Sequence, residues 1–246
     1  MPNRRHASVA VEAGNRIYWF DAGEGCSYTA HLMGLDLLKV GRIVISHTHM
    51  DHLGGLGNLL WNIRKLTYMR KHRLEENIQV YIPDMGSWEG LMMLMHNTEE
   101  RFTTREGTPF PVNANKVEAG ILFDDGVMKV TALENRHMVR WETDRCLSYS
   151  YLIECEGKRL VYSGDVARYE DLDPFVKDGC DGLIIETGHF GIDAVQQYVL
   201  DKKIGRIFFS HNGREILNHP EESRNKVQCY FEGRGIICED GMTFEL

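Results

Sequence analysis

The chain has 246 residues, which is long enough to bury a substantial core in one domain. Hydrophobic residues make up 43% and charged residues 26%, as in ordinary globular proteins, and the formal net charge of −8 argues against a surface built for a long polyanion. No apolar run approaches the roughly 18 residues of a membrane span, and no apolar stretch follows the first basic residues, so we expect no membrane partner and a cytoplasmic location.

The first half of the sequence alternates strand-like and helix-like segments. Residues 8–12 and 16–20 predict a β-hairpin around Gly14-Asn15. The segments expected after it are a helix over 28–38, a strand over 41–46, a helix over 53–73, a strand over 78–82 and a helix from Asp84 to His96.

The second half continues this alternation without a repeat or a linker, so we predict a single domain over 1–246. Strands are expected near 127–133, 147–154, 159–163, 182–186 and 206–210, with terminal strands around Ile236 and Thr243. Helices are expected near 170–177, 191–203 and 219–231.

The cysteines and two further segments favour structural interpretations. Cys26, Cys146, Cys155, Cys180, Cys229 and Cys238 form no CxxC pair, so neither a disulfide framework nor a zinc knuckle is indicated. The basic residues over 64–73 are interleaved with Trp61 and Tyr68, and we interpret them as a solvated helix face. The apolar residues over 91–95 are typical of a packed helix stripe.

Three imidazoles and a carboxylate gather where the strand over 41–46 stops. They are His47, His49, Asp51 and His52, and a helical pattern follows them at once. Alternation along an extended segment directs His47 and His49 the same way, so that both can bind one ion. Neutral imidazole and carboxylate are ligands that Zn²⁺, Mn²⁺ and Fe²⁺ accept in catalytic sites.

This HxHxDH motif resembles the signature of the metallo-β-lactamase-fold hydrolases. Those proteins take their remaining ligands from a later lone His, then an Asp and a His that each follow a strand. His137 follows the predicted strand 127–133, Asp165 follows an apolar run into a glycine turn, and His211 follows the predicted strand 206–210.

The resemblance implies the fold class and the metal content. The fold is α/β, a four-layer αββα sandwich in which helices flank two mixed β-sheets. Two divalent ions per chain are implied, with Zn²⁺ as the first expectation and Mn²⁺ or Fe²⁺ left open. The implied ligands of one ion are His47, His49 and His137. Those of the other are Asp51, His52 and His211, with Asp165 bridging.

The same resemblance implies hydrolysis by a hydroxide that the two ions share. Asp51 would orient this hydroxide or accept its proton. Asp21 matches an early Asp of the family and would hold a ligand histidine in its binding tautomer.

Within the superfamily, the sequence is most similar to the ribonuclease Z-like phosphodiesterases. Phe20-Asp21-Ala22-Gly23-Glu24-Gly25 is similar to their FDxGEG segment. In that group a Glu pairs with a later His, which helps to protonate the leaving oxygen. Glu186 and His189 are the residues expected in these roles.

Two departures favour a small phosphodiester or an oligonucleotide over precursor tRNA. Residues 52–137 contain no glycine/proline-rich basic arm, and the stretch over 138–145 is longer and more charged than in the group. Arg140, Trp141 and Arg145 in that stretch would contact phosphate and base, or form a solvated loop. A homodimer is a further expectation, since the resembled enzymes are commonly dimers.

Two alternative functions stay open at this point. A thioester, lactone or lactam carbonyl is an electrophile that suits the same di-metal site. A non-catalytic binding or sensory module would keep the fold without turnover.

Overall fold

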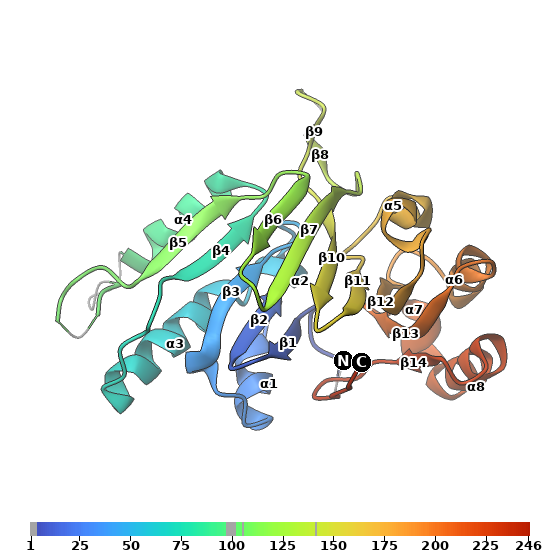
Figure 1. Ribbon diagram of the computed structural model, residues 1–246, viewed down its shortest axis with the longest axis horizontal. Coiled ribbons are helices and arrows are strands. Elements are labelled where there is room, and N and C mark those ends of the chain that lie inside the picture. Colours follow the sequence, from blue (N-terminus) through green and yellow to red (C-terminus); the bar gives the residue numbers. More distant parts are fainter. Residues whose placement is uncertain (1–3, 97–101, 105, 141) are drawn as a thin grey trace. The chain divides into compact units, whose positions relative to one another are not determined.

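The computed structural model describes residues 4–96, 102–104, 106–140 and 142–246 (Figure 1). The chain divides into two compact units, Met1–Val117 and Glu118–Leu246, each with its own sheet and its own core. The single domain over 1–246 stays a prediction.

The sheet of the first unit has five strands in the order β1-β2-β3-β4-β5. Their bounds are β1 Val9–Ala13, β2 Arg16–Phe20, β3 Val40–Val44, β4 Ile78–Ile82 and β5 Val112–Lys116. β1 and β2 form the predicted antiparallel hairpin, and β2, β3, β4 and β5 pair in parallel.

The helices of this unit are α1 Cys26–Leu32, α2 Met50–Leu53, α3 Leu56–Arg70 and α4 Met85–His96, with a 3₁₀ turn over Leu37–Lys39. Alternate residues of the central strands, such as Trp19, Ile43 and Val80, are buried in one cluster with Leu59 and Ile63 of α3. The packing of α3 on the sheet therefore fixes the end of β3, where the HxHxDH motif begins.

Glycines shorten the two long helices predicted in this unit. The helix expected over 28–38 ends at Leu32, because Gly34 adopts a left-handed conformation with φ of 75°. The helix expected over 53–73 is broken at Gly54-Gly55 into α2 and α3. The predicted cap of α4 is present, since the Asp84 carboxylate accepts from Ser87 N at 2.9 Å.

One residue departs from each of two interpretations, that of a solvated basic helix face over 64–73 and that of a packed apolar stripe over 91–95. The other basic residues, Lys65, Arg70, Lys71 and Arg73, are exposed as expected, and Leu91 and Met92 pack against the core. Arg64 is buried instead of solvated; its guanidinium stacks on Trp61 and Tyr68, and its Nε donates to Thr103 O at 2.7 Å. In α4, Met95 is buried but Leu94 is 70% exposed. Successive helical residues turn by about 100°, so Leu94 points away from the buried side.

The sheet of the second unit has seven strands in the order β14-β13-β12-β11-β10-β7-β6. Their bounds are β6 Gly120–Asp124, β7 Met128–Glu134, β10 Tyr149–Cys155, β11 Lys158–Tyr162, β12 Cys180–Glu186, β13 Ile204–Ser210 and β14 Gly235–Ile237. The strands from β6 to β11 pair antiparallel, and those from β11 to β14 pair in parallel.

Helices cover one face of this sheet, as Figure 1 shows for α6 and α8. They are α5 Asp173–Val176, α6 Ile192–Val199, α7 Arg214–Asn218 and α8 Pro220–Phe231, with a 3₁₀ turn over Tyr169–Leu172. A separate two-stranded arm consists of β8 Val139–Arg140 and β9 Arg145–Cys146.

Most strands of this unit agree with the prediction, but some predicted and observed elements differ. The strand expected around Thr243 is absent from the described C-terminal residues. Strand β6, the short strands β8 and β9 and helix α7 were not predicted, and neither was β5 of the first unit. Trp141, which the sequence places with Arg140 and Arg145, lies outside the described residues. No helix among the described residues has the length and apolar character that crossing a membrane requires.

We predict that Leu59→Ala lowers the free energy of unfolding by about 2–5 kcal/mol, because Leu59 is fully buried and its truncation leaves a cavity. Urea unfolding measures this loss. Met69→Ala on the same helix is the control; Met69 is 79% exposed, and its replacement should leave the midpoint nearly unchanged. Equal midpoints for the two variants would contradict the packing described for α3.

Candidate metal centre

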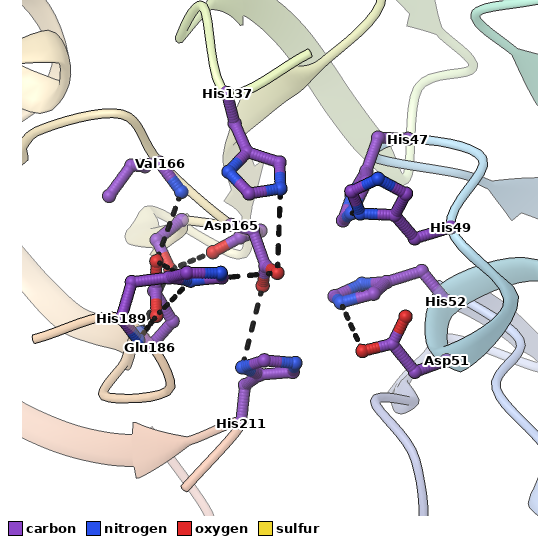
Figure 2. A network of polar contacts seen from close by, with 12 residues as sticks. His47, His49, Asp51, His52, His137, Asp165, Val166, Glu186, His189 and His211 are labelled. Carbon is purple, nitrogen blue, oxygen red and sulfur yellow. Dashed lines mark hydrogen bonds and ion pairs between the residues drawn. The ribbon is translucent and has the colours of Figure 1, made fainter. Parts of the chain in front are cut away.

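Strand β3 leads directly into the first group of candidate ligands (Figure 2). His47 is fully buried and His49 is exposed, and His47 Nε2 lies 3.0 Å from His49 Nδ1. The extended backbone therefore directs both rings the same way, as predicted. The short helix α2 then carries Asp51 and His52, and an Asp51 carboxylate oxygen lies 3.8 Å from His52 Nε2.

The buried carboxylate of Asp21 fixes the orientation of side chains in and next to this group. Asp21 accepts from Ser46 N at 2.6 Å and from the Ser46 hydroxyl at 2.7 Å. Its Oδ2 also lies 2.7 Å from His52 Nδ1, so that nitrogen carries the proton, because an ionised carboxylate can only accept. His52 Nε2 is then the nitrogen with a lone pair for a metal.

Ser46 orders the neighbouring ring in the same way. Its hydroxyl proton goes to Asp21, and its oxygen lies 3.0 Å from His47 Nδ1. This oxygen therefore accepts from His47 Nδ1–H, which leaves His47 Nε2 as the ligand atom. Asp21 and Ser46 together determine the tautomers of two histidines.

Glycines let the loop of Asp21 approach the ligand loop closely. A Cβ at Gly23 would overlap the carbonyl oxygen of Asp51, and a Cβ at Gly55 would overlap the carbonyl oxygen of Gly23. Neither position tolerates a side chain without movement of the backbone. Contact between two loops therefore requires glycine at positions 23 and 55.

In the second unit, three imidazoles surround the buried carboxylate of Asp165 (Figure 2). His137 Nε2 lies 3.8 Å from Oδ2, His189 Nδ1 lies 3.8 Å from Oδ2, and His211 Nδ1 lies 3.7 Å from Oδ1. Asp165 follows β11 and His211 follows β13, and these parallel strands end at one edge of the sheet.

Asn135, which was not predicted, connects two of these candidate ligands. It is fully buried, and its Nδ2 donates to Asp165 O at 2.8 Å and to Ser150 Oγ at 3.0 Å. Its Oδ1 accepts from His137 N at 3.2 Å. One amide thus sets the spacing between the His137 loop and the Asp165 loop.

The predicted partners Glu186 and His189 are in contact. His189 Nδ1 lies 3.0 Å from Glu186 Oε1, and His189 N donates to Glu186 Oε2 at 3.0 Å. Val166 N donates to the same carboxylate at 3.2 Å. Burial raises the pKa of the Glu186 carboxyl, the Asp165 charge raises it further, and the bonds from His189 and Val166 oppose this rise.

Gly188 and His211 meet in a tightly fitted pair. A Cβ at Gly188 would overlap the imidazole of His211, which itself has a left-handed backbone with φ of 43°. A left-handed conformation is uncommon for a residue other than glycine and occurs often at functional sites. The sequence analysis did not predict this contact, nor the roles of Ser46 and Asn135.

The donor chemistry of both units fits divalent metal ions. Within the second unit, one donor atom from each of Asp165, Glu186, His189 and His211 lies within 4.8 Å of all the others. In the first unit, Ser46 and Asp21 occupy Nδ1 of His47 and His52, so Nε2 is the ring atom of each that would bind an ion. Neutral imidazole and carboxylate in such groups are typical of Zn²⁺, Mn²⁺ and Fe²⁺ sites.

Residues 18–212 match the model of the β-lactamase superfamily domain. The chain belongs to this superfamily. Ribonuclease BN of Escherichia coli O1:K1 is 30% identical over 148 residues, a match that covers 58% of this chain and 40% of that protein. The chain thus spans less than half the length of this curated relative.

Solved structures agree on the fold. The short form of human tRNase Z superposes with a TM-score of 0.70 at 18% identity, covering 98% of this chain and 93% of that one. The metallo-β-lactamase fold protein YhfI of Bacillus subtilis gives 0.74 at 16% identity, with coverage of 98% and 92%. The predicted α/β fold class, the metallo-β-lactamase fold with mixed sheets and flanking helices, is confirmed, as is the ribonuclease Z-like resemblance.

We predict that Asp21→Asn lowers zinc affinity by about 10- to 100-fold, because an amide offers one acceptor oxygen where the carboxylate serves Ser46 and His52 with two. Competition with a chromophoric chelator measures the affinity. The control is Asp36→Asn, which changes an exposed carboxylate that caps the 3₁₀ turn after α1. If both variants keep the affinity of the parent protein, Asp21 does not position a ligand.

A second prediction concerns Asn135→Ala. The change leaves buried backbone groups of His137 and Asp165 without their partner, so the free energy of unfolding should fall by about 1–3 kcal/mol. Chemical denaturation measures the change, with Asn77→Ala, at an exposed hydrogen bond, as the control. A loss no larger than that of the control would refute the connecting role.

Proposed function

We propose that the chain is a metal-dependent phosphodiesterase of the ribonuclease Z type with a dinuclear centre. The ligands proposed for one ion are His47, His49 and His137. Those proposed for the other are Asp51, His52 and His211, with Asp165 shared between the two ions. Bound divalent ions lower the pKa of water and stabilise negative charge on phosphoryl oxygens.

The tautomers described above support these ligand assignments. His47 and His52 each donate Nδ1–H to a neighbouring group of the first unit, so Nε2 is the nitrogen through which each would bind a cation. The carboxylate of Asp165, close to His137 and His211, offers two oxygens, which suits a bridging ligand. Zn²⁺ is the ion we propose first.

Asp51 is the residue proposed to orient the attacking water molecule and to accept its proton. Its side chain is partly exposed, while its neighbour His52 is fully buried. An ionised carboxylate with access to solvent can orient a water molecule and accept its proton.

The contact between Glu186 and His189 is the observation that carries the choice of substrate. Glu186 is buried and accepts from His189 Nδ1, whereas the His189 side chain is 44% exposed. Glu186 therefore occupies Nδ1, and Nε2 is the nitrogen proposed to give a proton, which it does from the imidazolium form, where both ring nitrogens carry hydrogen. A proton donor is needed when an alkoxide leaves, as it does in phosphodiester cleavage. Glu186 acts as the positioning residue of this pair.

The relatives support the same substrate class. The curated relative in Escherichia coli is a ribonuclease by name, and a structural neighbour is a tRNase. For this chain we propose a small phosphodiester or an oligonucleotide as the substrate. A homodimer stays a prediction.

The proposal predicts that the activity lost on replacing His189 depends on the leaving group of the substrate. His189→Ala should lower kcat/KM by about 10²- to 10⁴-fold for a dinucleotide, whose ribose oxygen needs a proton. The loss should be much smaller for bis(p-nitrophenyl) phosphate, because nitrophenolate leaves without one. Steady-state kinetics on the metal-loaded protein measures both losses.

His219→Ala is the matched control, since His219 is an exposed histidine of the same unit outside the candidate centre. It should retain both activities, and chelation should abolish them. Equal losses on the two substrates would reject the acid role of His189. Good thioester turnover without phosphodiester turnover would favour the carbonyl alternative. Titration calorimetry that finds fewer than two ions per chain would reject the dinuclear centre.

A further inference from the structure

The second unit gathers four metal-binding side chains by itself, without the HxHxDH motif. They are Asp165, Glu186, His189 and His211, and one donor atom of each lies within 4.8 Å of all the others. Asp165 and His211 are ligands of the dinuclear centre proposed above, whereas Glu186 and His189 are not. The four side chains therefore form a second ligand set that shares two members with the proposed centre.

The spacing of the donor atoms is close to that around a tetrahedral ion. His189 Nδ1 lies 3.0 Å from Glu186 Oε1 and 3.8 Å from Asp165 Oδ2, and His211 Nδ1 lies 3.7 Å from Asp165 Oδ1 (Figure 2). Bonds of about 2.0–2.2 Å at tetrahedral angles place neighbouring donor atoms about 3.3–3.6 Å apart. The three distances lie on either side of this range, so side-chain movements of a few tenths of an ångström would complete the site.

Hydrogen bonds within the unit hold these side chains in place. Glu186 Oε1 accepts from Val166 N at 3.2 Å, and Glu186 Oε2 accepts from His189 N at 3.0 Å. Asn135 Nδ2 donates to Asp165 O at 2.8 Å. An ion would take the place of the proton on His189 Nδ1, which leaves to solvent, and the two backbone bonds to Glu186 would remain.

The charges of the set also favour a cation. The carboxylates of Asp165 and Glu186 are buried, with 2% and 1% exposure. Buried charges are stabilised by pairing or by coordination to a metal. A divalent ion among two carboxylates and two neutral imidazoles gives the whole set no net charge.

We propose that the first divalent ion to bind the apoprotein occupies this four-ligand site, and that the singly loaded protein is a resting form. Four protein ligands complete a tetrahedral shell, as in structural zinc sites, and leave no position for a water molecule or a substrate. The resting form also keeps Asp165 and His211 from the proposed dinuclear centre. This inference rests on the proposed function and adds a step of metal loading that controls it.

Further loading ends the resting form. When Asp165 and His211 become ligands of the dinuclear centre, Glu186 and His189 return to the contact that the structure shows. His189 is then again held by the buried carboxylate, as its proposed acid role requires. Turnover is therefore expected to begin only above one ion per chain.

The test is a titration of the full-length apoprotein with Co²⁺, whose visible absorption is strong in tetrahedral sites and weak in octahedral ones. We expect the first equivalent to give the tetrahedral spectrum. His189→Ala should lower the affinity for this equivalent by more than about 100-fold, because loss of an outer partner of a ligand alone costs about 10- to 100-fold. The His189 side chain is 44% exposed, so its truncation should leave the fold intact.

Three further variants assign the first ion to the second unit. His219→Ala removes an exposed histidine outside the set and should bind the first equivalent like the parent protein. His49→Ala removes an exposed candidate ligand of the first unit; it should leave the first equivalent unchanged and weaken the second. Glu186→Gln keeps the shape of the side chain and should weaken the first equivalent as His189→Ala does.

Several outcomes would overturn the inference. They are a first equivalent that His49→Ala weakens, one that His189→Ala leaves unchanged, an octahedral spectrum at one ion per chain, and full turnover of bis(p-nitrophenyl) phosphate at one ion per chain. Failure of the proposed function is distinguishable, because the titration needs no turnover. A tetrahedral first equivalent that depends on His189, in a protein inactive on every phosphodiester at full loading, would keep the site and reject only the phosphodiesterase.

Discussion

Parallel pairing of β11, β12 and β13 is the constraint on which the candidate centre of the second unit depends. It brings three chain segments to one edge of a sheet, where Asp165, Glu186 and His211 follow or end the strands. Ligands from parallel strands collect at such carboxyl ends in α/β proteins. In the first unit, β3 ends in the same way, directly before the HxHxDH motif.

The positions of the candidate ligands then depend on buried polar groups with complete hydrogen bonding. Asp21 and Asn135 are both fully buried, and each connects loops that are far apart in sequence. Removing either one leaves buried donors or acceptors without a partner, which costs more than one hydrogen bond contributes. These groups fix the positions of the candidate ligands, which suits the metal site proposed here.

The candidate ligands were easier to recognise in the sequence than the residues that position them. His47, His49, Asp51 and His52 were recognisable because a strand and a turn bring them together within six residues. Asn135 and Ser46 were missed, since Asn and Ser are common in loops and only tertiary contacts reveal their bonds. The strand β5 was missed because its VNANK sequence is poor in β-branched and aromatic residues. The prediction of a continuous helix over 53–73 was wrong. The carbonyl oxygen of Gly23 lies so close to position 55 that this position requires glycine instead of a good helix former.

The left-handed backbone of His211 has a consequence for engineering this chain. A glycine or asparagine adopts φ of 43° at lower cost than histidine does, so the native residue holds conformational strain of about 1–3 kcal/mol. Selection for thermal resistance alone would therefore favour losing this imidazole. With the metal role proposed for His211, durability and metal retention would be opposing demands at one position, and a stabilised library would need a screen for cation content.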